Sequence, residues 1–119
     1  MNYKDMAIQD KKRTKALMEA LPNEMDGFRQ MRMPSLEDTV LTAKTKELIA
    51  VAIGVGIRCE SCIVAHMGRL IALDASREEV VEALGVCLYM GGGPATAYCG
   101  KALACFDELM AEKEAKAKK

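Results

Sequence analysis

The stretch AKTKELIAVAIGVGIRCESCIVAHMGRL, residues 43–70, decides the fold. After a polar first turn, residues 48–57 are apolar on every side, which is typical of a buried helix, and Thr42 is placed to cap that helix. A second helix is expected from near Cys59 to about Leu73. The segment GVGIR between them would allow an antiparallel hairpin around Gly54, Gly56 and Arg58.

Helical patterns also run through the chain before this stretch. Residues 3–21 are predicted to form a helix that Pro22 ends. Residues 22–35 are predicted to form only a short helix, because Gly27 and Pro34 interrupt them.

Two more helices are expected after the stretch. Ser76 and Glu79 have the spacing of a capping box ahead of a helix over residues 77–90. The glycines of GGGP, residues 91–94, should end that helix, and the proline suits the first turn of a last helix from Ala95 to about Lys113, followed by a fraying, solvated end. No strand alternation, long linker or internal repeat is visible. The sequence therefore predicts one all-α domain over residues 1–119.

The composition argues against several classes of partner. Seventeen Lys and Arg balance seventeen Asp and Glu, so no global field attracts nucleic acid or an anionic membrane. The start of the chain is polar where a secretory segment would be apolar. The longest apolar run, residues 48–57, is about half of the roughly 20 residues that a spanning helix needs. We expect a cytoplasmic protein that contacts neither nucleic acid nor membrane.

The apolar content also predicts self-association. Half of the 119 residues are hydrophobic but only 4% are aromatic, so the core must consist of aliphatic, methionine and cysteine side chains. A chain of this size has more apolar surface than one small core readily hides. An obligate homo-oligomer is the expected state.

The chemistry of the chain is concentrated in the second half of the opening stretch. Cys59, Cys62 and His66, the only histidine, have the spacings of three and four residues that place side chains on one face of a helix. Cys59 would lie in the first turn, where the helix dipole stabilises a thiolate, and Cys62 would be within reach of the imidazole. Because a close cysteine pair in a reducing compartment is typically redox-active, catalytic or metal-binding, this pair is a candidate site.

Zinc is one alternative for these residues. The two cysteines and the histidine supply three ligands of the right type, and a structural zinc site normally has four. The fourth would be Glu47, Cys87, Cys99 or Cys105. The three cysteines lie among apolar residues of predicted helices, where a small buried hydrophobe is the simpler interpretation.

Glu47 has a second possible role. It lies at the polar end of the apolar helix, and an antiparallel hairpin would return it to roughly the level of His66. Its carboxylate could then orient the imidazole and stabilise its charged form, as in the base-plus-orienter pairs that activate nucleophiles. An ordinary glutamate at a helix start remains the alternative.

These residues carry a family resemblance. The spacing of Glu47, Cys59, Cys62 and His66, followed by GGGPATAYCGKALACFDEL, resembles the alkylhydroperoxidase AhpD-like branch of the carboxymuconolactone decarboxylase family. The resemblance covers about residues 22–110. It implies an all-α helical bundle that assembles into oligomers, often trimers or hexamers.

The resemblance also implies a role for each residue of the motif. Cys62 would attack the peroxide, Cys59 would resolve the product to a disulfide, and His66 and Glu47 would form a proton relay. A lipoyl-bearing or thioredoxin-like protein would supply the electrons. Glu60 and Ser61 depart from relatives that often carry an aromatic residue between the cysteines, which bears on substrate preference.

The expected activity is therefore thiol-dependent reduction of hydroperoxides, with no cofactor. The glycines of GVGIRCE do not follow a strand, so they are not a nucleotide-binding pattern. Three alternatives stay open: a protein disulfide reductase that uses the same cysteines, a lactone decarboxylase, and a zinc-bound structural module. The decarboxylase branch generally lacks the cysteine pair.

Overall fold

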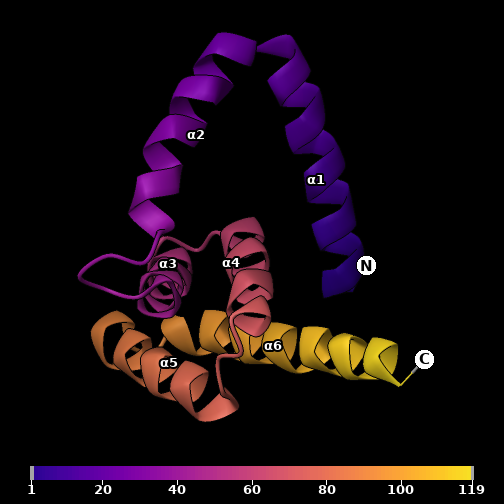
Figure 1. Cartoon of the computed structure of the whole chain (residues 1–119). Coiled ribbons are helices and arrows are strands. Elements are labelled where there is room, and N and C mark those ends of the chain that lie inside the picture. The colour runs from indigo at the N-terminus through magenta and orange to yellow at the C-terminus, as the bar shows by residue number, and fades with distance from the viewer. Residues whose placement is uncertain (1, 119) are drawn as a thin grey trace.

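The computed structural model describes residues 2–118, and within them the protein consists of six helices and no strand. The helices are α1 (Tyr3–Ala20), α2 (Pro22–Leu36), α3 (Ala43–Gly56), α4 (Glu60–Ala72), α5 (Arg77–Gly91) and α6 (Ala95–Ala117). Helices α3 to α6 pack together as a body, while α1 and α2 rise from it and meet at their far ends as an inverted V, here called the α1–α2 arm (Figure 1). The all-α prediction is confirmed.

The α3–α4 hairpin is the centre of the body. Thr42 caps α3 as predicted, because its side chain accepts a hydrogen bond from the amide of Thr45. Both helices supply fully buried aliphatic side chains to the core, and α5 and α6 complete it. The buried apolar residues are Val51, Val55, Ile63, Val64, Met67, Leu70, Ile71, Ala75, Val80, Leu84, Ala102, Cys105 and Phe106.

Both ends of α5 and the start of α6 lie where the sequence predicts them. Ser76 and Glu79 form the predicted capping box, and Gly92, with a φ of 69°, ends α5 in a conformation that favours glycine. Pro94 occupies the N-cap of α6. The last helix continues to Ala117, beyond the predicted end at Lys113, although residues 113–118 are exposed.

The α1–α2 arm differs from the prediction. Pro22 begins α2 directly after α1, but α2 continues through Gly27 and Pro34 to Leu36, so the expected short helix is a full-length one. Pro34 lies in the last turns, where its missing amide removes a single intrahelical bond. Neither arm helix has a buried residue. Glu108 of α6 holds the start of α1. Its carboxylate accepts hydrogen bonds from the backbone amides of Tyr3 at 3.2 Å and Lys4 at 2.8 Å.

The prediction that α3 is buried on all sides is wrong for one of its faces. Val51 and Val55 are buried, but Ile49 and Ile53 are 44% and 56% exposed. The physical reason is that α4, α5 and α6 pack against one side of α3, and within residues 2–118 Ile49 and Ile53 on the other side stay largely uncovered.

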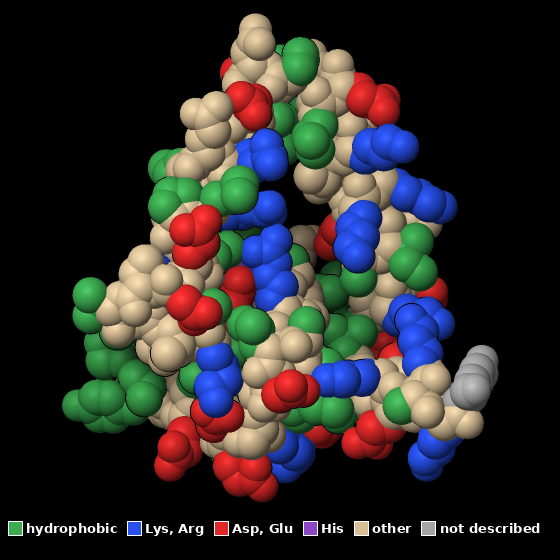
Figure 2. All heavy atoms as spheres, viewed as in Figure 1, with side chains coloured by type: hydrophobic (Ala, Val, Ile, Leu, Met, Phe, Trp, Pro, Cys, Tyr) green, Lys and Arg blue, Asp and Glu red, His purple; other side chains and the backbone are tan. Residues whose placement is uncertain are grey.

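The exposed face of α3 continues onto α5. Ile49 and Ile53 of α3, with Val86 and Met90 of α5, line an apolar hollow of about 420 Å³ that we call the α3–α5 patch. Figure 2 shows hydrophobic side chains gathered over the end of α5. None of the described helices is both long enough and apolar enough to span a bilayer.

We propose that the α3–α5 patch is covered in a homo-oligomer, since large contiguous apolar patches are rare on the surface of monomers. Light scattering at micromolar concentration should give a multiple of the 13.0 kDa chain mass. Ile53→Glu, which places a charge in the patch, should shift the mass towards the monomer. Ala104→Glu, at an exposed position of α6, should not. A monomeric wild-type protein would contradict the proposal.

Candidate dithiol site

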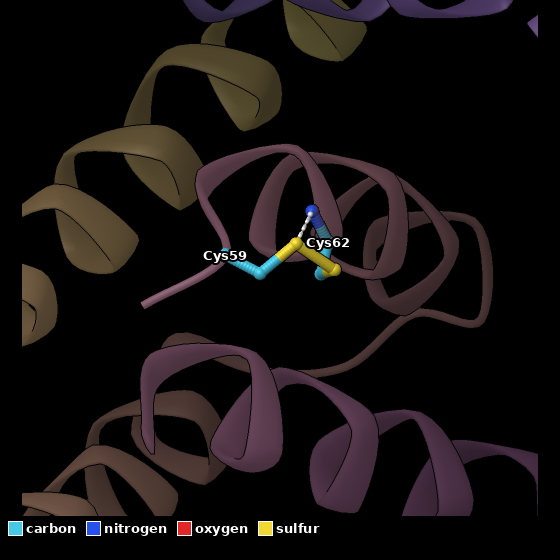
Figure 3. Close-up of a disulfide and its surroundings, with 2 residues drawn as sticks. All are labelled: Cys59 and Cys62. Atoms are coloured by element: carbon cyan, nitrogen blue, oxygen red, sulfur yellow. Dashed lines mark hydrogen bonds between the residues drawn. A yellow bond between two sulfur atoms is a disulfide. The ribbon is translucent and has the colours of Figure 1, made fainter. Parts of the chain in front are cut away.

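Cys59 and Cys62 form a disulfide at the start of α4 (Figure 3). Their Cα atoms are 5.2 Å apart, within the range that a disulfide bridges. Cys59 is the N-cap of α4 and not part of its first turn, and its sulfur accepts a hydrogen bond from the amide of Cys62 at 3.1 Å. Both side chains are half-buried. The unpaired amides and the dipole of α4 therefore act most directly on the sulfur of Cys59.

The turn between α3 and α4 fixes the position of the pair. Arg58 has a φ of 57°, a left-handed conformation that directs the chain back towards α3. The amide of Cys59 donates to the carbonyl oxygen of Gly54 at 2.9 Å. A Cβ atom on Gly54 would be 3.3 Å from the Cβ of Cys62 and 3.4 Å from Cγ1 of Ile63. The absence of a side chain at Gly54 thus allows the two helices to approach at the disulfide.

The hairpin brings Glu47 and His66 together, as the sequence predicted. Oε2 of Glu47 is 2.5 Å from Nδ1 of His66. The glutamate is only 3% exposed, while the histidine is half-buried. Because a carboxylate at Nδ1 fixes the orientation of the ring, Nε2 is left as the nitrogen for proton exchange.

Arg69, which belongs to none of the sequence motifs, also contacts this pair. Its guanidinium is 3.5 Å from the second carboxylate oxygen of Glu47. Burying a carboxylate is costly unless it is paired, so Arg69 and His66 together account for the buried position of Glu47. The available signal was spacing, because Arg69 follows His66 by three residues on the same helix.

The acidic residue between the cysteines has a partner of its own. Lys101 of α6 is 3.6 Å from the carboxylate of Glu60. This positive charge partly offsets the repulsion that Glu60 would exert on a thiolate at Cys59.

The other three cysteines lie apart from the disulfide. Cys105 is fully buried in the core, and burial raises the pKa of its thiol to about 12. Cys87 and Cys99 are half-buried, and their thiols face the carbonyl oxygens of Ala52 and Leu84. Burial raises the pKa of each of these thiols too. Over residues 2–118, no three His, Cys, Asp or Glu side chains gather in a group that could hold a metal ion.

The fold and the site define a small all-α protein with a cysteine pair at a helix start and a buried carboxylate–imidazole pair beside it. The sequence model of the carboxymuconolactone decarboxylase family matches residues 22–104, and the chain belongs to this family. An uncharacterised protein of Cupriavidus necator is 41% identical over 81% of this chain and 85% of its own length. An uncharacterised protein encoded in the cox locus of Paracoccus denitrificans is 36% identical over 71% of this chain and 76% of its own length.

Solved structures of the family have the same fold. A carboxymuconolactone decarboxylase family protein from Legionella pneumophila superposes with a TM-score of 0.88 at 36% identity, over 91% of this chain and 96% of its own. A family protein from Thermotoga maritima, for which an involvement in the antioxidative response has been suggested, superposes with a TM-score of 0.78 at 27% identity. That comparison covers 91% of this chain and 94% of the other.

The close approach at Gly54 can be tested by filling it. Gly54→Val should destabilise the protein by about 1–3 kcal/mol, because the added side chain must push apart α3 and the start of α4. The matched change Gly85→Val meets no atom within 4 Å of its Cβ and should cost much less. Urea unfolding of the two variants measures the difference. Equal stabilities would show that the helices do not need this contact.

Proposed function

We propose that the protein is a thiol-dependent peroxidase that reduces alkyl hydroperoxides through a Cys59/Cys62 dithiol–disulfide cycle. The observation that carries the proposal is the pairing of Glu47 with His66 one turn beyond a bridged cysteine pair. The suggestion of an antioxidative role for the Thermotoga maritima relative supports the same assignment.

Cys62 is the proposed attacking residue. It precedes His66 by four residues, so both lie on one face of α4. The imidazole, oriented by Glu47, takes the proton of the Cys62 thiol. The thiolate then attacks the distal oxygen of the hydroperoxide, the O–O bond breaks, and the alkoxide leaves as the alcohol after it takes up a proton. Cys62 becomes a sulfenic acid.

Cys59 is the proposed resolving residue. Its position at the N-cap of α4, with the amide of Cys62 directed at its sulfur, favours a thiolate there. This thiolate attacks the sulfenic sulfur, the S–O bond breaks, and the hydroxide leaves as water after it takes up a proton, which leaves the disulfide.

An external dithiol completes the cycle. It attacks the disulfide through a mixed disulfide, returns both cysteines to thiols and is itself oxidised to a disulfide. A lipoyl-bearing or thioredoxin-like protein is the proposed donor.

A protein disulfide reductase is the second candidate. It is favoured by the N-cap position of Cys59, since a sulfur at a helix start is the low-pKa nucleophile in other CxxC motifs. The two functions differ in their relative rates. Turnover of cumene hydroperoxide and of a disulfide-bonded protein substrate, each measured with the same panel of dithiol donors, separates them.

The proposed proton relay predicts a specific loss of activity. Glu47→Gln and His66→Gln should each slow peroxide reduction by about 10²–10⁴-fold, the usual range for loss of general-base assistance. Stopped-flow measurement of the first turnover isolates the chemical step from the donor. Glu82→Gln, on an exposed position of α5, is the matched control and should react at the wild-type rate. Unchanged rates in both relay variants would exclude the relay.

The two cysteines should behave differently when separated. Cys59→Ser should react once with a hydroperoxide and leave Cys62 as a sulfenic acid that dimedone labels, because no neighbouring thiol resolves it. Cys62→Ser should stay unlabelled. Mass spectrometry after one equivalent of peroxide reports the site. Oxidation of Cys59 in the Cys62→Ser protein, with an unreactive Cys62 in the other variant, would reverse the assigned roles.

A further inference from the structure

A large open cleft lies between α1, α4 and α6, away from the α3–α5 patch. Its volume is about 930 Å³, near the upper end of the range for small-molecule sites. Arg32 of α2 also lines it, so the V of the arm encloses it on one side. Figure 2 shows Lys and Arg side chains on both sides of the opening between α1 and α2.

The charge of the cleft differs sharply from that of the chain. Seven lysine and arginine side chains line it against two carboxylates, Asp10 and Glu112, while the whole chain has a net charge of zero. Concentration of one sign of charge in a concave site raises the local concentration of oppositely charged ligands. The charge of the cleft therefore favours a ligand with negative charge.

Several of these cations have no carboxylate to neutralise them. Three of the seven are paired: Lys4 with Glu112 at 3.2 Å, Lys113 with Asp74 at 3.1 Å, and Arg69 with Glu47 at 3.5 Å. The part of the chain that the structure describes offers no ion pair to Lys11, Lys15, Arg32 or Lys116. These four form the excess positive charge.

The cations are spread along the cleft. Lys4, Lys11 and Lys15 have spacings of seven and four residues and share one face of α1. At the rise of an α-helix this row extends over roughly 16 Å. One carboxylate or one phosphate can contact only part of it. Because Glu112 pairs Lys4, the cations left for a ligand are Lys11 and Lys15 on α1, Arg32 on α2 and Lys116 on α6. A ligand that contacts cations on more than one helix carries several separated negative charges.

The floor of the cleft is apolar. Val64 and Ile71 of α4 form part of it and are almost completely buried by the protein itself, and Leu109 of α6 adds to it. Gly68 lies on the same floor, and a Cβ atom there would meet nothing within 4 Å. The space above Gly68 is thus open to an apolar group.

We propose that this cleft binds an organic polyanion with an apolar chain, of the acyl-polyphosphate kind represented by coenzyme A thioesters. The chain would lie on the floor at Gly68, and the phosphates would contact Lys11 and Lys15. The floor lies in a concave cleft between α1, α4 and α6, a shape that fits a soluble molecule better than a flat bilayer. The lining of the cleft does not include Cys59, Cys62 or His66, although Arg69, which contacts Glu47, lies at its edge. The inference makes no use of the peroxidase proposal.

Calorimetric titration of the full-length protein with decanoyl-coenzyme A tests the site. Lys11→Gln/Lys15→Gln should weaken binding on the order of tenfold, since two charged contacts are lost. Lys12→Gln, on the neighbouring face of α1 and outside the cleft, is the control and should bind normally. Gly68→Leu should abolish binding by filling the floor while keeping the helix stable, whereas Gly85→Leu, an equally open glycine of α5, should not.

The separate parts of the probe give further outcomes. Decanoate and inorganic triphosphate should each bind much more weakly than decanoyl-coenzyme A, because each uses only half of the cleft. Absence of heat up to about 1 mM decanoyl-coenzyme A, or equal affinity of all four variants, would overturn the proposal. So would tight binding to vesicles that contain phosphatidic acid. If Lys11→Gln/Lys15→Gln changes the oligomeric mass and the wild type does not bind the thioester, the cleft is an interface between copies instead.

Discussion

The close contact of α3 with the start of α4 at Gly54 is the constraint on which the rest of the structure depends. The carbonyl oxygen of Gly54 accepts a hydrogen bond from the amide of Cys59, and because Gly54 has no side chain, Cys62 packs closely against α3. This contact fixes the register of the hairpin. The same register buries Val51 and Ile63 in the core and carries Glu47 to His66. Stability and the geometry of the candidate site therefore have one origin, and a change at Gly54 would act on both.

The sequence was most informative where local signals and tertiary packing agree. Thr42, Ser76 and Gly92 cap their helices through contacts with residues close to them in the chain, so the sequence alone predicts these roles. The Glu47–His66 pair was also predictable, because a hairpin of two regular helices leaves few possible registers.

The sequence was least informative where a result depends on what surrounds an element. The apolar residues on every side of α3 did not reveal that Ile49 and Ile53 stay exposed in the protomer. Such a pattern indicates which side chains can be buried, but it does not say whether another element packs over them. Pro34 suggested a short helix, but a proline near a helix end removes little. The contact of Arg69 with Glu47 depends on the rotamer of a long side chain, which spacing alone does not give.

The anchoring of the arm has a consequence for its dynamics. Helices α1 and α2 bury no side chain completely, and the start of α1 relies on the carboxylate of Glu108 for two amide hydrogen bonds. Segments with few buried contacts open locally at a free energy well below that of global unfolding. The arm should therefore open as a separate cooperative unit while the α3–α6 body stays folded. Any surface that packs against the arm would raise its protection from amide hydrogen exchange, so the order of the arm is coupled to the binding of whatever it contacts.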